Sequence, residues 1–321
     1  SNDKRSFYNF YAETGTLEPA PPPLWYGTRG IVAGGFYWNN PGTFTNVIDY
    51  TTISSTGSTQ DFGDLTQARQ TSAGMSNSTR GCFGGGGPVT NIIDYITIAS
   101  TGNAVDFGDL TNIIQSVAGC SNGSRGIVGG GFNSPADFNV IQYITISNTG
   151  NATDFGDLTQ ARRNLGALGG STRGVFASGQ NPSYVNTIDY ITIASTGNAV
   201  DFGDLTDTYS YGEGCSSKTR GVFSTFGTPS NNFCNEIEYI TVASTGNAQD
   251  FGDLTQGRSG GGANSNGTRG TFSGGYKSPG SGSGQFSDVI DYITIASTGN
   301  AADFGDLSQA RYYPGSLSGD A

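Results

Sequence analysis

The stretch IIDYITIASTGNAVDFGDL, residues 92–110, returns almost unchanged as TIDYITIASTGNAVDFGDL at 187–205 and as VIDYITIASTGNAADFGDL at 289–307. A protein needs its catalytic site only once, whereas a sequence motif that recurs along the chain indicates a repeated structural unit. Six T/S-R-G tripeptides mark the same period of about 48 residues. Their arginines are Arg29, Arg80, Arg125, Arg173, Arg220 and Arg269. The chain therefore consists of six repeats of one supersecondary unit.

Each repeat contains four segments with the pattern of a β-strand. RGIVAGG (29–35) is short and apolar, and IDYTTIS (48–54) alternates polar and apolar side chains as a half-buried strand does. After a glycine-containing STG turn, DFGDL forms the third strand, and the run QARQTSAGM (67–75) is predicted to form the fourth. A four-stranded meander of this length has the size of a β-propeller blade.

The two ends of the chain distinguish a closed ring from an open solenoid. The first repeat begins at Thr28 without a preceding QAR-type segment, whereas QARYYPGSLSG (309–319) has no RG strand after it. A C-terminal strand that completes the first blade closes the ring and removes the open edges that a solenoid has to cap. We predict an all-β protein, with a six-bladed propeller over residues 24–321.

Composition supports a folded β protein and limits its partners. The 321 residues include 52 Gly, 19 Phe and 16 Tyr, and no apolar pattern with a helical period. The net charge of −11 comes largely from the DFGD copies, and it disfavours binding to nucleic acid or to an anionic membrane surface. No stretch is apolar enough to cross a bilayer.

The residues also disfavour metal and cofactor chemistry. There is no histidine, and the four cysteines, Cys82, Cys120, Cys215 and Cys234, lack the spacing of metal ligands. We expect partly buried free thiols and no cofactor. The DFGD aspartates are interpreted as turn-forming residues, in preference to calcium ligands, because each copy lacks a dense run of oxygen ligands.

The repeated side chains are assigned to the framework. The phenylalanines of DFGDL and the tyrosines of IDY are predicted to pack blade against blade. The six TRG arginines are each predicted to bind a carboxylate of the same or the next blade, since the guanidinium group donates in pairs. A charged binding ring is the alternative reading of these arginines.

Two resemblances follow from the order of motifs in the repeat. The sequence of Gly-Gly, I-D-Y, DFGDL and A-R resembles a degenerate kelch repeat. TRGCFGGG (79–86) and NIIDYITIASTGNAVDFGDLT (91–111) more closely resemble repeats of virion-associated proteins from tailed phages that infect marine bacteria. This second resemblance implies a structural protein of the virion, such as a tail fibre or surface appendage. The chain departs from the pattern at Gln142, Glu238 and residues 224–226.

Specificity is expected where the repeats differ most, in the segment between the glycine pair and the I-x-Y strand. In a propeller all six such loops emerge on one face, and rigid scaffolds often carry recognition on loops. Aromatic residues stand in these loops beside Asn, Ser and Gln, a combination suited to stacking on sugars or docking on protein. They are Tyr37, Trp38, Tyr184, Phe233 and Tyr276. The predicted ligand is a host-surface glycan or a neighbouring virion protein.

Residues 1–23 lie outside the repeats and are predicted to form an extended arm. Phe7, Tyr8, Phe10 and Tyr11 precede a proline-rich stretch. We expect these aromatic residues to dock on the propeller or on other virion proteins, which makes the arm an assembly anchor.

The favoured function is therefore a non-enzymatic structural or recognition module on a virion. Without histidine the usual general base is missing, and no Ser or Cys lies in a nucleophile motif. A polysaccharide-degrading enzyme with carboxylates in the channel is one alternative. A cellular kelch-like protein-interaction scaffold is the other.

Overall fold

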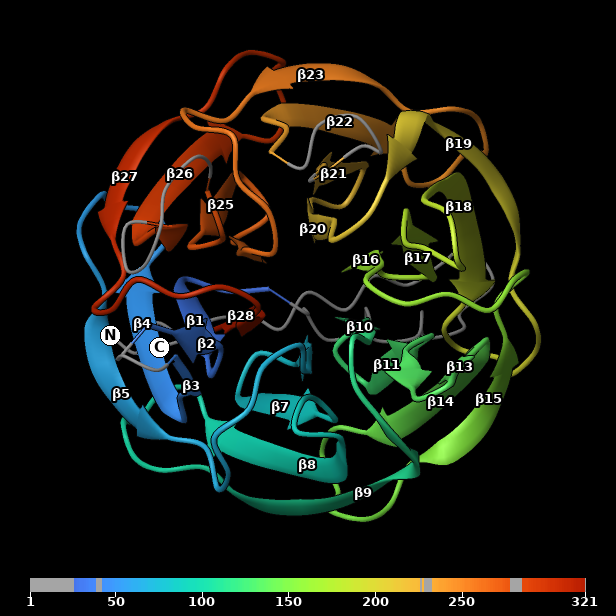
Figure 1. Ribbon diagram of the computed structural model, residues 1–321, viewed down its shortest axis with the longest axis horizontal. Coiled ribbons are helices and arrows are strands. Elements are labelled where there is room, and N and C mark those ends of the chain that lie inside the picture. Colours follow the sequence, from blue (N-terminus) through green and yellow to red (C-terminus); the bar gives the residue numbers. More distant parts are fainter. Residues whose placement is uncertain (1–25, 39–41, 226, 228–232, 278–284, 321) are drawn as a thin grey trace, which may run out of the picture.

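The computed structural model describes residues 26–38, 42–225, 227, 233–277 and 285–320. These residues form six four-stranded antiparallel sheets, arranged as blades around a common axis (Figure 1). The prediction of an all-β, six-bladed propeller is confirmed. The N-terminal arm, with Phe7, Tyr8, Phe10 and Tyr11, lies outside the described residues. No helix in the described part has the length and apolarity needed to span a membrane.

Every blade repeats the same order of strands from the axis outward. The innermost strands are β6 (Ala73–Ser76), β10 (Ala118–Ser121), β16 (Gly166–Gly169), β20 (Glu213–Ser216), β24 (Gly262–Ser265) and β28 (Gly315–Gly319). The second strands, which begin at the TRG arginines, are β1 (Arg29–Ala33), β7 (Arg80–Gly84), β11 (Arg125–Gly129), β17 (Arg173–Ala177), β21 (Arg220–Ser224) and β25 (Arg269–Ser273).

The two outer positions carry the IDY and DFGD motifs. The third strands are β4 (Val47–Thr52), β8 (Thr90–Thr97), β14 (Val140–Thr145), β18 (Val185–Thr192), β22 (Glu236–Thr241) and β26 (Val289–Thr294). The outermost strands are β5 (Gln60–Asp64), β9 (Val105–Ile114), β15 (Thr153–Asp157), β19 (Val200–Tyr209), β23 (Gln249–Asp253) and β27 (Ala302–Asp306). Two short hairpins, β2 (Phe36–Tyr37) with β3 (Thr43–Phe44) and β12 (Phe132–Asn133) with β13 (Ala136–Asp137), extend from blades 1 and 3.

The C-terminal strand closes the ring as predicted. β28 pairs antiparallel with β1, and its register runs from Arg29 opposite Gly319 to Ala33 opposite Gly315. The last strand of each sequence repeat is therefore the innermost strand of the next blade. The predicted bounds of that strand are wrong at the QAR motif, because β6 begins only at Ala73 and Arg69 lies in the turn before it.

Glycine is required where the innermost strands of neighbouring blades meet. A Cβ atom added at Gly74 of β6 would lie 1.9 Å from the carbonyl oxygen of Ser316 in β28. The same addition at Gly119 of β10 would lie 2.6 Å from the carbonyl oxygen of Gly74. Close approach of backbones near the axis thus accounts for the glycine content of these strands.

The hydrophobic core lies between the blades. Phe62 of β5 shares one buried cluster with Ile96 and Ile98 of blade 2, and Tyr50 packs against the edge of this cluster. Tyr50 and Phe62 make an edge-to-face pair with ring centroids 6.0 Å apart, and the equivalent pair recurs in every blade. The predicted role of the repeated aromatic residues in blade packing is confirmed.

The cysteines are part of this core. Cys82, Cys120 and Cys215 are free and buried, and Cys234 is buried as well. Burial raises the pKa of each of the first three thiols to about 12. These thiols are therefore protonated at neutral pH and packed as small apolar groups.

Candidate functional site

The TRG arginines link each blade to the next, but their partners differ from those predicted. Arg29 Nη1 donates to the carbonyl oxygen of Ile98 in blade 2 at 2.6 Å, and its Cζ lies 4.5 Å from the centre of the Tyr50 ring. The other five arginines repeat this contact with a carbonyl of the following blade. Each also lies over the tyrosine of its own IDY motif. Each TRG arginine therefore binds a backbone carbonyl of the next blade and the tyrosine ring of its own blade, and not the predicted carboxylate.

The carboxylates of the IDY motif bind a second set of arginines, from the QAR turns. Arg69 Nη2 lies 2.9 Å from Asp94 Oδ2, and both side chains are fully buried. Equivalent buried pairs are Arg162 with Asp189, Arg258 with Asp291 and Arg311 with Asp49. In each pair the arginine belongs to the turn of one blade and the aspartate to the third strand of the next. Burial lowers the pKa of these arginines, and the neighbouring aspartate opposes that effect.

The sequence contained a signal for these pairs that our interpretation missed. Arginine and aspartate are lost together at two of the six blade boundaries, where Ile114 stands with Gln142 and Tyr209 with Glu238. At these boundaries the outer strands β9 and β19 continue through Ile114 and Tyr209 and are ten residues long. Gln142 Oε1 accepts hydrogen bonds from the backbone nitrogen and hydroxyl of Thr111 at 2.7 and 2.9 Å. Glu238 likewise accepts hydrogen bonds from the backbone nitrogen and hydroxyl of Thr206, so hydrogen bonds to a threonine take the place of the ion pair at both boundaries.

The variable loops lie on the face opposite the TRG turns, because each loop follows the second strand of its blade. Several loops pair with the segment that leads into the innermost strand, as Phe36 does with Tyr312 and Tyr276 with Ser259. Because these segments lead to the innermost strands, the pairing brings loop residues from different repeats close to the central axis.

A rim of residues with left-handed backbone surrounds the axis on this face. Each blade contributes one such residue: Thr71, Ser116, Asn164, Tyr211, Gly260 and Tyr313, with φ between 54° and 66°. Adjacent rim residues are hydrogen-bonded, for example Tyr211 N to Asn164 O at 2.7 Å and Thr71 N to Tyr313 O at 2.7 Å. Bulky residues rarely adopt positive φ, and strain of this kind concentrates at functional sites. The conformation is shared by all six blades, and Tyr211 and Tyr313 are the two positions at which it carries an aromatic side chain.

Beside Tyr211 the loop face contains a hollow of about 300 Å³ lined by aromatic rings. Its lining residues are Tyr184, Tyr211, Gly227, Phe233, Ser259 and Tyr276. The rings of Phe233 and Tyr276 are tilted against each other with centroids 5.7 Å apart. We call these four aromatic residues and the space between them the aromatic hollow.

The structure thus brings together three of the five predicted loop residues: Tyr184, Phe233 and Tyr276. The other two, Tyr37 and Trp38, belong to blade 1 and do not line the aromatic hollow; Tyr37 pairs with Thr43, and Trp38 is 43% exposed. Sequence reasoning missed Tyr211, which stands where the corresponding turn of the first repeat has Thr71.

The hydroxyl groups of Tyr184, in the hollow, and Tyr312, beside it, remain protonated at neutral pH. Burial and the neighbouring Tyr211 raise the pKa of Tyr184. The pKa of Tyr312, close by, is raised mainly by burial. Neutral phenols both donate and accept hydrogen bonds, and their rings present apolar faces. The hollow therefore offers ring faces and hydroxyl groups without a fixed charge.

In the described part of the chain no three histidine, cysteine or acidic side chains come close enough to hold a metal ion. The sequence matches no protein-family model and no curated protein.

Proposed function

We propose that this protein is a non-enzymatic recognition module of a phage particle, and that the aromatic hollow binds one sugar residue of a host-surface glycan. The observation that carries the proposal is the convergence of Tyr184, Phe233 and Tyr276. These residues come from three different variable loops, so their meeting is a property of this chain and not of the repeat.

The size and lining of the hollow support a sugar as the ligand. Its volume of about 300 Å³ is at the lower end of the range for small-molecule sites. Aromatic rings pack against the C–H faces of a sugar, while the hydroxyls of Ser259 and the tyrosines form hydrogen bonds with the hydroxyl groups of the sugar. A neutral hollow suits a neutral hexose better than a sugar acid.

The distribution of carboxylates favours binding over hydrolysis. A glycosidase of the usual kind uses two carboxyl groups on either side of the scissile bond. The residues that line the aromatic hollow include no acid, and those that line the two cavities of the central channel include one, Glu213. A single carboxyl group does not provide the acid and base pair.

A glycan array carrying envelope polysaccharides of marine bacteria tests this proposal. We expect the protein to bind a subset of neutral glycans, and Phe233→Ala and Tyr276→Ala to weaken that binding at least tenfold. Trp38→Ala is the matched control, because Trp38 is an exposed loop aromatic outside the hollow. Equal binding by all three variants, or no binding by the native protein, contradicts the proposal.

The location on a virion is supported by the resemblance of TRGCFGGG (79–86) and residues 91–111 to phage virion repeats. Mass spectrometry of purified particles tests it directly, and we expect the protein to copurify at constant stoichiometry. If the ligand is instead a neighbouring virion protein, the Phe233→Ala variant should be incorporated into particles less than the native protein. Recovery only from uninfected cells supports the cellular scaffold instead.

A further inference from the structure

Glu213 is a carboxyl group at an unusual place, the innermost strand of blade 5. It begins β20, where the other five innermost strands begin with Ala73, Ala118, Gly166, Gly262 and Gly315. Its side chain lines a cavity of about 70 Å³ in the mouth of the central channel, just below the rim. The repeat does not require an acid here, since small residues form the same strand elsewhere.

No counterion accompanies this acid. The residues that line the channel cavities include neither lysine nor arginine. In the described part of the chain no hydrogen bond or ion pair to the Glu213 carboxyl group is found. Glu213 is part-buried, and partial desolvation of a carboxylate without a nearby cation is unfavourable, an effect that a bound cation offsets.

Tyr211 and Tyr313 lie at the rim of this cavity. Their rings stack with centroids 5.1 Å apart and an interplanar angle of 27°. Gly260 makes room for the Tyr313 ring, because a Cβ atom there would lie 2.1 Å from Tyr313 Cε1. The faces of tyrosine rings attract cations. Both rings are therefore placed to contact the part of a ligand that emerges from the channel.

We propose that the channel mouth is a binding site for the ammonium head group of a small organic amine, with Glu213 as its counterion. The head group donates to the Glu213 carboxylate, which lines the cavity. Its alkyl part passes the rings of Tyr211 and Tyr313. A volume of about 70 Å³ holds a head group of a few heavy atoms. Calcium is a poorer fit, because it takes six to eight oxygen ligands.

Binding at this site is coupled to a proton. Burial raises the pKa of Glu213 well above its ordinary value, so the carboxyl group of the empty site is protonated over a wider pH range. An ammonium ion binds the ionised form and therefore displaces that proton. The other titratable groups that line the cavity are the phenols of Tyr211 and Tyr313, and burial also raises the pKa of Tyr313. Affinity should therefore rise with pH until the amine itself loses its proton.

Isothermal titration of the full chain with n-butylammonium chloride tests the site. We expect saturable binding that is tighter at pH 8 than at pH 5.5. Two buffers of different ionisation enthalpy should reveal a proton released on binding. Glu213→Gln and Glu213→Ala should each weaken binding at least tenfold; the alanine reproduces the residue of β6 and β10, so the fold is expected to tolerate it. Asp207→Asn, which removes an exposed acid, is the matched control and should bind as the native protein does.

Two further probes distinguish the source of the amine. Glucosamine and a peptide with a central lysine present the same ammonium group on a sugar and on a protein. If only butylammonium binds, the site is assigned to small free amines. If glucosamine or the peptide also binds, and Glu213→Gln abolishes that binding, the site is assigned to an amino sugar or to a lysine side chain, respectively. Native protein that does not bind butylammonium, or Glu213 variants that bind it unchanged, overturns the proposal. The glycan-binding proposal is unaffected by either result, because its probes are neutral sugars.

Discussion

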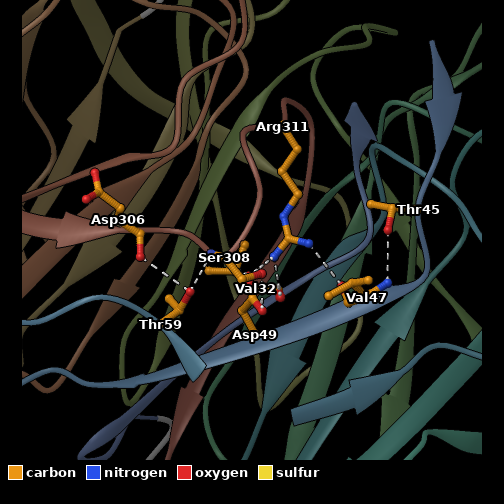
Figure 2. Close-up of polar contacts among 8 residues, drawn as sticks. All are labelled: Val32, Thr45, Val47, Asp49, Thr59, Asp306, Ser308 and Arg311. Carbon is orange, nitrogen blue, oxygen red and sulfur yellow. Dashed lines mark hydrogen bonds and ion pairs between the residues drawn. The ribbon is translucent and has the colours of Figure 1, made fainter. Parts of the chain in front are cut away.

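Arg311 and Asp49 are 262 residues apart in the sequence, yet Arg311 Nη2 lies 2.7 Å from Asp49 Oδ2 and both side chains are fully buried (Figure 2). The same aspartate accepts hydrogen bonds from the hydroxyl of Ser308 at 2.7 Å. This pair joins blade 6 to blade 1, so the boundary at which the chain closes is built in the same way as three internal ones.

Arg311→Ile is expected to lower the free energy of unfolding by about 3–5 kcal/mol, because it leaves Asp49 buried and unpaired. The double variant Arg311→Ile with Asp49→Gln reproduces the Ile114 and Gln142 pair of another boundary. It should therefore recover at least half of the loss. Urea denaturation of both variants measures this, and a double variant no more stable than the single one contradicts the expectation.

The C-terminal strand should be essential for closure. Deletion of residues 315–321 removes β28 and leaves the edge of β1 unpaired beside the channel. We expect loss of cooperative unfolding and self-association through that edge, measured by calorimetry and light scattering. Deletion of residues 320–321, which lie beyond β28, is the control and should leave both properties unchanged.

Gly63 of the DFGD motif should resist substitution more strongly than Gly102 of the STG turn. Both have positive φ, 146° and 154°. A Cβ atom at Gly63 would lie 2.5 Å from the backbone of Gly102 in the next blade, whereas one at Gly102 would have no atom within 4 Å. Since the backbone strain is similar, Gly63→Ala should cost at least about 1 kcal/mol more than Gly102→Ala. Equal melting temperatures would contradict this packing argument.

Glu238 should make stability depend on pH. Burial is the main cause of its raised pKa, and no arginine faces it at this boundary. A raised pKa in the folded state means that its contribution is fully present below its ordinary pKa and is lost as pH rises through the folded value. Glu238→Gln should therefore gain stability over the native protein as pH rises from 4 to 8. Gln142→Glu should create the same dependence in blade 3, and parallel pH profiles for all variants would rule the effect out.

Arg173 is expected to stabilise the ring without taking part in binding. Its Nη1 donates to the carbonyl oxygen of Val242 at 2.9 Å, and its Cζ lies 4.3 Å from the centre of the Tyr190 ring. Arg173→Ala should cost about 1–2 kcal/mol, and Arg173→Lys less, because the cation over the ring is kept. Glycan binding should be unchanged, since Arg173 lies on the opposite face. An unchanged melting curve would remove the proposed structural role.

The blade architecture was predictable because its signals are local. IDY, the STG turn and DFGDL are adjacent in the sequence, and their repetition identifies the strands and the number of blades. The buried pair of Arg69 and Asp94 was harder to predict, because its members belong to different repeats. In the sequence, the sign of their interaction is their joint absence at two boundaries, one with Ile114 and Gln142 and the other with Tyr209 and Glu238.

The candidate sites depend on features that one sequence does not display. Tyr211 and Tyr313 have left-handed backbone, which the smaller rim residues Thr71 and Ser116 also adopt. Their meeting depends on the curvature of the ring and on the missing side chain of Gly260. For the same reason Trp38 was predicted to share a binding face with Phe233, and only the structure shows which loops form one hollow.

The offset between repeat and blade has a consequence for how such a chain can change its length. Each sequence repeat supplies three strands to one blade and the innermost strand to the next, and β28 supplies it to the first. Recombination between two copies therefore adds or deletes one whole period and leaves every remaining blade with four strands. The packing of the glycine-rich innermost strands around the axis therefore limits the number of blades. The point at which the sequence repeat begins does not limit it.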